Sequence, residues 1–379
     1  MELFMKANGL CDPRFELVRE AFEANFAGGT ELGASVAVTL DGEFVVDLWA
    51  GNKNSAGDPW EKDTICNVYS TTKTMASSCM LMLADRGAIS FDEPVSTYWP
   101  EFAANGKSKV LLSHVMSHQT GCSGFPRPVT ASELYDHALM ADLLAGMKPW
   151  WEPGTGPGYH AITQGTLQAE VLRRVDGRSL GTFFKEEIAE PLGADFHIGL
   201  SASEGHRVAD LKQPGSTLSG SMGVASDSIA GRTFDSCILD GSEPLTQEWR
   251  SAEIPAAGGI GNARSVARVH SMLACGGSVG GVKLMSPEAI ELALVRQTFV
   301  PDKVLGMNVP YGMGFGINHE HAPITPSKRT LYWFGWGGSM GIIDLDQRLS
   351  IAYVMNNMAD ELLGDSRALN IAAATYAAL

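Results

Sequence analysis

Apolar positions change their spacing along the chain, and each spacing predicts one kind of element. In residues 15–26 the aromatic and aliphatic side chains recur at helical intervals and share one face. Residues 34–51 instead form two apolar runs joined at Asp41-Gly42, a dipeptide typical of a tight hairpin turn. The chain is therefore predicted to begin with a helix followed by a β-hairpin.

The rest of the chain shows helices first and strands again near the end. From about residue 70 to 240, helical spacing alternates with long loops rich in glycine and proline. A further helix is predicted at 286–297, where Ser286 is placed to cap it and Pro287 to open it. Four strands and a C-terminal helix are then predicted at 311–317, 329–336, 339–346, 348–356 and 368–379.

This order predicts an α+β fold in which one antiparallel sheet is built from both ends of the chain and flanked by helices. A mainly helical region is inserted between the two sets of strands. We expect residues 1–65 and 250–379 to form the sheet domain and residues 66–249 the helical domain, with an active site between them.

Composition and charge fit a globular enzyme and exclude some partners. Apolar residues make up 45% and charged residues 19% of the 379 positions, and the formal net charge is −15. Such a negative charge argues against nucleic acid or an anionic membrane as a partner. Residues 1–15 resemble no secretory signal, no apolar run is long enough for a membrane span, and the six cysteines are scattered. We therefore expect a cytoplasmic protein with reduced, mostly buried thiols.

Residues 337–341 match the G-x-S-x-G pattern of esterase nucleophiles, with Ser339 at its centre. That pattern requires a strand, a strained turn and then a helix. Residues 342–356 instead continue as β-branched, apolar strand sequence. We therefore expect Ser339 to lie at the start of a strand, which disfavours a hydrolase that uses its hydroxyl together with a distant histidine.

A better candidate nucleophile lies in residues 68–87, which read as a buried helix that ends at Gly87. Ser70 is expected in its first turn, and Lys73 follows one turn later on the same face. A neutral lysine amine can take the proton of a serine hydroxyl, and burial lowers the pKa of the amine toward that state. Taken alone, the S-x-x-K spacing favours a simpler explanation, a capping serine and a solvated lysine. The spacing occurs at a single place in this chain, however, which keeps Ser70 and Lys73 as candidates.

Two further segments carry candidate chemistry. Tyr159 follows a Gly/Pro-rich loop and precedes a helix, where it is placed to exchange protons with Ser70 and with a leaving group. A tyrosine packed at the start of a helix is the simpler explanation when the segment is taken alone. The second segment, residues 336–339, brings a backbone N–H to the start of a strand, where it can form an oxyanion hole with the N–H of Ser70.

In this order, S-T-T-K at 70–73, the Tyr159 loop and W-G-G at 336–338 resemble motifs of class C β-lactamases and penicillin-binding proteins. They resemble the family VIII carboxylesterases more closely, over roughly residues 30–357. The resemblance implies a β-lactamase/DD-peptidase-like fold without cofactor or metal. It also implies that Ser70 is the nucleophile and that Lys73 and Tyr159 are the acid/base pair. The N–H groups of Ser70 and Ser339 would form the oxyanion hole, and the substrate-binding segment would consist of Trp336, Gly337 and Gly338.

Two departures from the lactamase pattern bear on the substrate. Ala161 stands where that pattern has an asparagine, and Trp336 stands where it has a lysine or histidine. In the lactamase pattern, the asparagine side chain would bind the amide of a β-lactam, and the cation would bind its carboxylate. We therefore expect a serine esterase that acts on small neutral, short-chain esters through a Ser70 acyl-enzyme. A β-lactamase, an acyltransferase and a catalytically silent binding protein remain the alternatives.

Overall fold

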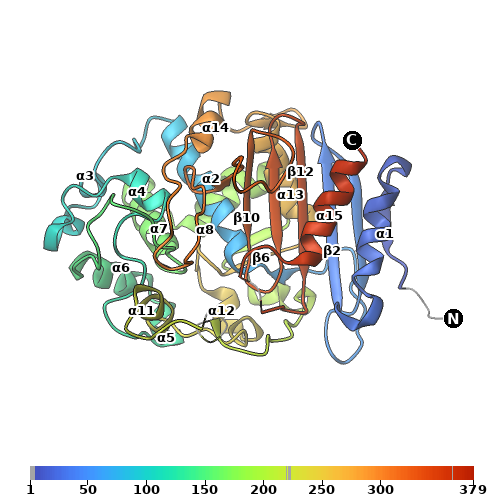
Figure 1. Ribbon diagram of the computed structural model, residues 1–379, viewed down its shortest axis with the longest axis horizontal. Helices are drawn as coiled ribbons and strands as arrows, with labels where there is room; N and C mark the ends of the chain where they lie inside the picture. The colour runs from blue at the N-terminus through green and yellow to red at the C-terminus, as the bar shows by residue number, and fades with distance from the viewer. Residues whose placement is uncertain (1–4, 219, 221–222, 361) are drawn as a thin grey trace.

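One antiparallel sheet, built from both ends of the chain, organises the fold (Figure 1). The structure is a computed structural model that describes residues 5–218, 220, 223–360 and 362–379. Within them the sheet has seven strands, and every neighbouring pair is antiparallel, which confirms the predicted arrangement. In spatial order these are β1 (Asn8–Cys11), β3 (Glu43–Gly51), β2 (Gly33–Leu40), β12 (Leu349–Met355), β11 (Met340–Asp344), β10 (Thr330–Phe334) and β9 (Gly316–Ile317).

The first and last parts of the chain meet in the middle of this sheet. β2 pairs with β12 from Leu40 opposite Leu349 to Ala34 opposite Met355. The predicted hairpin is present, and both turn residues, Asp41 and Gly42, have the positive φ that a tight hairpin turn requires. Since β2 and β12 are buried almost throughout, helices must cover both of their faces.

The covering helices come from three places in the chain. α13 (Ala263–Ala274) packs on β2, β11 and β12 from one side. α1 (Glu16–Ala24) and α15 (Ser366–Ala377) pack against each other on the opposite side, where α15 crosses in front of the sheet (Figure 1). The predicted N- and C-terminal helices are thus confirmed, and together they close the sheet into a layered core.

The middle of the chain is mainly helical, as predicted, and its helices lie to one side of the sheet (Figure 1). Besides the central helix described next, its α-helices in the described residues include α3 (Val95–Tyr98), α4 (Leu112–Met116), α5 (Ala131–Leu134), α6 (His137–Gly146), α7 (Thr163–Asp176), α8 (Leu180–Phe184), α9 (Glu190–Leu192), α11 (Ile229–Asp235) and α12 (Gln247–Ser251). Further elements are α14 (Pro287–Leu294) and two small sheets, β4-β6-β5 and β7-β8, formed by Cys66–Asn67, Gly259–Gly261, Phe196–Ile198, Ser278–Val279 and Val282–Lys283.

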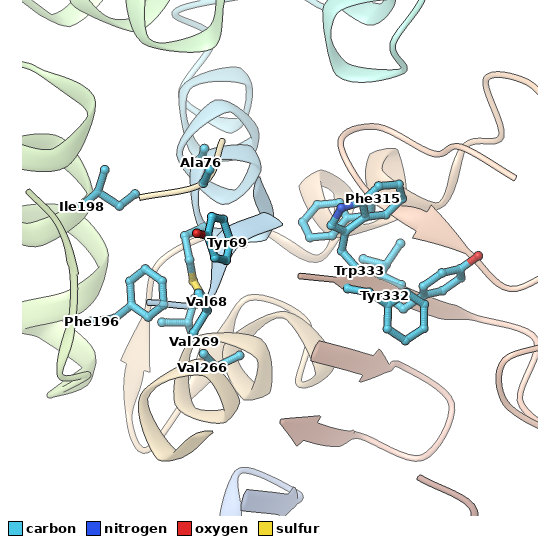
Figure 2. Packing of buried hydrophobic residues seen from close by; sticks show 14 of the residues in the cluster. Val68, Tyr69, Ala76, Phe196, Ile198, Val266, Val269, Phe315, Tyr332 and Trp333 are labelled. Carbon is cyan, nitrogen blue, oxygen red and sulfur yellow. The ribbon is translucent and has the colours of Figure 1, made fainter. Parts of the chain in front are cut away.

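α2 (Thr72–Asp85) occupies the middle of the molecule, and its residues from 72 to 83 are all buried. It packs against α7, α8 and α14 and against the end of β10. Figure 2 shows the start of this helix above α13, with Val68 and Tyr69 close to Val266 and Val269 and with Trp333 of β10 to one side. The N-terminal end of α2 therefore lies where the helical region meets the sheet.

Two predicted elements differ in extent from the structure. The strand expected at 311–317 is reduced to β9, because the chain turns at Gly314, whose backbone has a positive φ and lies against Ser77 of α2. Ser70 lies in a short 3-10 turn, Tyr69–Thr71, directly before α2 rather than within the α-helix. The division into a sheet domain of residues 1–65 and 250–379 and a helical domain of residues 66–249 stays a prediction.

Candidate active site

The backbone is strained immediately before Ser70. Tyr69 has φ 42°, a left-handed conformation that a bulky side chain seldom adopts. Its ring packs between Trp249 and Trp336, with ring centroids 6.2 and 5.1 Å away, and its hydroxyl donates a hydrogen bond to Glu243. Such strain persists where the surroundings over-determine it, and here those contacts fix the turn that carries Ser70.

The structure brings together the three side chains that the sequence singled out. The Ser70 Oγ lies 3.1 Å from the Lys73 Nζ and accepts a hydrogen bond of 2.7 Å from the Tyr159 hydroxyl. Lys73 lies in the first turn of α2, directly after the 3-10 turn that carries Ser70, whereas Tyr159 comes from the loop before α7, so tertiary packing supplies it. A hydroxyl in contact with both an amine and a phenol can lose its proton to one and receive a hydrogen bond from the other.

Lys73 is buried, and no carboxylate among the described residues pairs with it. Its side chain is 1% exposed, and its Nζ donates to the backbone oxygens of Ala161 (2.7 Å) and Ala256 (2.9 Å). Burial lowers the pKa of Lys73 well below its ordinary value, because the charged form loses its hydration. A neutral amine has two N–H bonds and one lone pair. With the two N–H bonds given to the two carbonyls, the lone pair is directed to Ser70.

The pKa of Tyr159 is shifted in the opposite direction from that of Lys73. The pKa of its phenol is raised to about 12, mainly by burial and in smaller part by the negative charge of Asp302. The neighbouring Ser70 hydroxyl and Trp333 indole lower that pKa in part, although the indole N–H makes no hydrogen bond of normal geometry within the described chain. The phenol therefore holds its proton at neutral pH and acts as a donor toward Ser70.

Gly337 and Gly338 form the turn between β10 and β11. Their φ values of 93° and 127° lie in the region that favours glycine. A Cβ on Gly338 would lie 2.7 Å from Arg367 Nη2 and from Asp365 Oδ2, and one on Gly337 would lie 2.7 Å from Met358 Cγ. Arg367 also donates to the Gly337 carbonyl at 2.9 Å. The close neighbours of both glycines are thus protein atoms from the C-terminal segment, which hold this turn in place.

Ser339 presents its backbone and buries its hydroxyl. The hydroxyl donates to the Val68 carbonyl at 2.8 Å and lies 2.8 Å from the Thr71 hydroxyl, and neither of these partners is a base. β11 begins at the next residue, which confirms the predicted strand in place of a nucleophile-elbow helix. In the described part of the chain, the N–H groups of Ser339 and Ser70 have no protein acceptor. Two such free donors are what an oxyanion requires.

Trp336 is buried against Tyr69, and its indole N–H has no partner among the described residues. Ala161 contributes its carbonyl oxygen to Lys73, whereas its methyl group carries no polar function. Trp336 and Ala161, the two residues that depart from the lactamase pattern, therefore offer neither a cation nor an amide side chain near Ser70.

Sequence reasoning missed several groups that hold this arrangement. The Ala256 carbonyl and Asp302, which accepts a hydrogen bond from the Tyr159 N–H at 3.0 Å, lie far from the three motifs in sequence. His118 and His160 are different, because the sequence indicates both, with packing or hydrogen bonding to loop backbone as their expected role. His118 Nδ1 accepts a hydrogen bond of 3.0 Å from the backbone N–H of His160, and burial lowers the pKa of both imidazoles. A carbonyl oxygen leaves no sequence signal, and Asp302 occurs in an ordinary Pro-Asp turn sequence.

Other kinds of site find no support in the described residues. They contain no group of three or more His, Cys, Asp or Glu side chains placed to hold a metal ion. None of the helices that these residues form is long and apolar enough to cross a membrane. All six cysteines are free, and all but Cys11 are buried, as predicted.

The fold and the comparisons with known proteins together place this chain among the serine hydrolases of the β-lactamase fold. The chain belongs to the β-lactamase family, since the family model described as "Beta-lactamase" matches residues 18–376.

Relatives and solved structures agree with this assignment. The chain is 35% identical to the "Esterase/beta-lactamase LipL" of Mycobacterium tuberculosis, over 94% of this chain and 84% of that protein. It is 40% identical to a family VIII carboxylesterase of known crystal structure, with a TM-score of 0.93 over 99% of this chain and 100% of the other. A penicillin-binding protein homologue from Caulobacter crescentus is 38% identical, with a TM-score of 0.92 over 99% and 100%.

Proposed function

We propose that this protein is a carboxylesterase that hydrolyses short-chain esters through an acyl-enzyme on Ser70. The observation that carries the proposal is the contact of the Ser70 Oγ with both the Lys73 Nζ and the Tyr159 hydroxyl. The 40% identity to a family VIII carboxylesterase supports the same activity.

Lys73 is the base of acylation in this proposal. Its two carbonyl partners take both N–H bonds of the neutral amine, so its lone pair accepts the Ser70 proton as the Oγ attacks the ester carbonyl. Tyr159 is the acid, because its phenol is protonated and already donates to Ser70. It gives its proton to the departing alkoxide and then receives the proton that Lys73 took.

The tetrahedral oxygen is stabilised by the N–H groups of Ser70 and Ser339, two donors without an acceptor in the described chain. In the second step, Lys73 takes a proton from the water that attacks the acyl carbon, and Tyr159 gives its proton to the Ser70 Oγ as the bond to the acyl group breaks. The proton on Lys73 then passes to Tyr159, and the carboxylic acid leaves. An alcohol in place of water would give acyl transfer by the same route.

The substrate class follows from Trp336 and Ala161. Neither residue offers a charge to a carboxylate, and desolvating an unpaired carboxylate costs on the order of a few kcal/mol, which corresponds to about a hundredfold in rate. Neutral esters are therefore preferred, with Trp336, Gly337 and Gly338 as the substrate-contacting segment. The second candidate is a β-lactamase, which the name of the M. tuberculosis relative favours.

A labelling experiment tests the nucleophile. A fluorophosphonate probe followed by peptide mapping is expected to modify Ser70, and Ser70→Ala is expected to lose both label and ester hydrolysis while staying folded. Modification of Ser339 would instead support the elbow mechanism. A folded protein that takes no label and hydrolyses no ester would be a silent binding protein.

A substrate comparison tests the specificity. We expect kcat/KM for 4-nitrophenyl butyrate to exceed that for a chromogenic cephalosporin by at least about a hundredfold on the same preparation. Equal or faster opening of the cephalosporin would make the protein a β-lactamase.

A further inference from the structure

Asp302 is a buried carboxylate that binds the backbone of Tyr159. Its side chain is 1% exposed, and its Oδ1 accepts hydrogen bonds from the N–H groups of Tyr159 (3.0 Å), Val304 (2.8 Å) and Leu305 (2.9 Å). Its Oδ2 accepts a hydrogen bond of 2.9 Å from the Tyr311 hydroxyl. These four donors surround a carboxylate that forms no ion pair within the described residues, which makes each of these bonds charge-assisted.

The segment that carries Asp302 docks on the Tyr159 loop through a second bond. The N–H of Lys303 donates to the Pro157 carbonyl at 2.9 Å. Residues 302–303 follow α14 and precede the strands of β9 and β10, whereas residues 157–159 precede α7. The two bonds therefore tie the tyrosine loop to a segment from the other end of the chain.

All three backbone donors around Tyr159 are used. The N–H of Gly158 donates to the His118 carbonyl at 2.9 Å, and the N–H of His160 donates to the His118 Nδ1 at 3.0 Å. The N–H between them, that of Tyr159 itself, is left for Asp302. Of these acceptors Asp302 is the charged one, and charge-assisted bonds are about twice as strong as neutral ones.

We propose that Asp302 is a positioning residue, which holds the Tyr159 backbone so that the phenol stays on Ser70 and can protonate the leaving alkoxide. This inference rests on the proposed function, because it assigns to Tyr159 the role of acid. A shift of about 1 Å in a reacting group is enough to slow a reaction a hundredfold, so an anchor on the Tyr159 N–H has a measurable effect.

The charges around the phenol agree with this assignment. The Lys73 Nζ lies 4.9 Å from the centre of the Tyr159 ring, and the imidazole of His118 packs against that ring at 5.1 Å. Burial lowers the pKa of both of these groups, so both favour their neutral forms. Asp302 is the negative charge that, after burial, raises the pKa of Tyr159 and so helps to keep the acid protonated.

The test uses two esters that differ in their need for an acid. 4-Nitrophenolate leaves without being protonated, whereas the ethoxide of ethyl butyrate requires a proton. Asp302→Ser keeps a hydroxyl that can cap the turn at Val304 and Leu305 but is one bond shorter and does not reach Tyr159. We expect kcat/KM to fall about 10- to 100-fold for ethyl butyrate and less than about threefold for 4-nitrophenyl butyrate.

Two variants serve as matched controls. Asp302→Asn keeps an oxygen acceptor of the same reach, and Tyr311→Phe removes a different bond to the same carboxylate. Tyr311→Phe is expected to stay within about threefold of the parent for both esters. Asp302→Asn keeps the acceptor but loses the charge, so it is expected to lose clearly less activity on ethyl butyrate than Asp302→Ser does. If Asp302→Ser does not fold, Asp302→Glu takes its place, because it moves the acceptor by one methylene, and the same difference between the two esters is expected.

The double variant Asp302→Ser with Tyr159→Phe shows whether Asp302 acts through Tyr159. If Asp302 acts through Tyr159, Asp302→Ser adds less than about twofold to the loss caused by Tyr159→Phe. An equal loss for both esters, or a full additional loss in the double variant, would show a general structural role and overturn the inference. A Tyr159→Phe variant with parental activity on ethyl butyrate would instead overturn the proposed function.

Discussion

Two lysines lie in the interior of this protein, and they do different things. Lys73 is 1% and Lys107 0% exposed, and neither forms an ion pair with a described residue. Lys107 donates to the carbonyl oxygens of Ala104 and Ala145 at 3.0 Å each and also to that of Met147. It thereby joins the end of α6 to the turn that precedes Lys107 itself.

The two lysines differ in the third hydrogen-bond partner of the Nζ atom. A carbonyl oxygen can only accept, so three carbonyls around Lys107 match the three N–H bonds of an ammonium. Around Lys73 the third partner is the Ser70 hydroxyl, which can also donate and so matches a neutral amine. Burial lowers the pKa of both lysines. Burial alone therefore does not distinguish the proposed base from the other buried lysine, whereas a partner that can give up a proton does.

The largest effect is expected for Lys73→Met. It removes the base and should lower kcat/KM for 4-nitrophenyl butyrate by about 10²- to 10⁴-fold, with the fold intact. In Lys107→Met, kcat/KM per folded molecule should stay within about threefold, because the Lys107 amine binds carbonyls away from the reacting groups. Comparable losses in both variants, measured with titrated active sites, would show that the two lysines are equivalent.

Stability should change in the opposite sense. Lys107→Met leaves three buried carbonyls without their donor and should lower the free energy of unfolding by about 3 kcal/mol. Lys73→Met leaves the Ala161 and Ala256 carbonyls without their donor but also removes an amine whose burial disfavours its charge, so its loss of stability should be smaller. Urea unfolding of both variants measures this, and an equal or larger loss in Lys73→Met would contradict it.

The pH dependence of catalysis gives the next effect in size. The pKa of Lys73 is lowered in the folded protein, so the neutral base is present above that pKa and is lost as the pH falls through it. We expect kcat/KM to fall about tenfold per pH unit on the acid side and to form a plateau at neutral to alkaline pH. The pKa of Tyr159, raised to about 12, predicts no alkaline decline below about pH 10.

The same profile is expected for Lys107→Met. A plateau that begins only near the ordinary pKa of lysine, about 10.4, would show that the Lys73 amine is charged in the resting enzyme. That result would transfer the role of base to another group.

The smallest effect extends the comparison to two serines. Ser339→Ala removes a hydroxyl that contacts Val68 and Thr71 but keeps the backbone N–H assigned to the oxyanion hole. We expect kcat/KM to stay within about tenfold and the melting temperature to fall by a few degrees. Loss of activity equal to that in Ser70→Ala would make the Ser339 hydroxyl the nucleophile.

The sequence by itself determined the local arrangements. The three-residue spacing of Ser70 and Lys73 predicts their contact, because residues one helical turn apart face each other. The hairpin at Asp41-Gly42 and the strand after Ser339 are likewise properties of a few neighbouring residues. Each of these predictions is confirmed, and each depends on backbone periodicity or turn chemistry alone.

Only the tertiary structure decided what surrounds the amine and the phenol. The carbonyls that bind Lys73 come from Ala161 and Ala256, which are 88 and 183 residues away in the chain. Asp302 reaches Tyr159 across 143 residues, and the positive φ of Tyr69 depends on rings that pack from distant segments. Because every residue has a backbone carbonyl, the sequence does not mark the ones that bind Lys73, and no side-chain pattern marks the left-handed turn here. These features arise from packing between distant segments, which the spacing of residues within one segment does not predict.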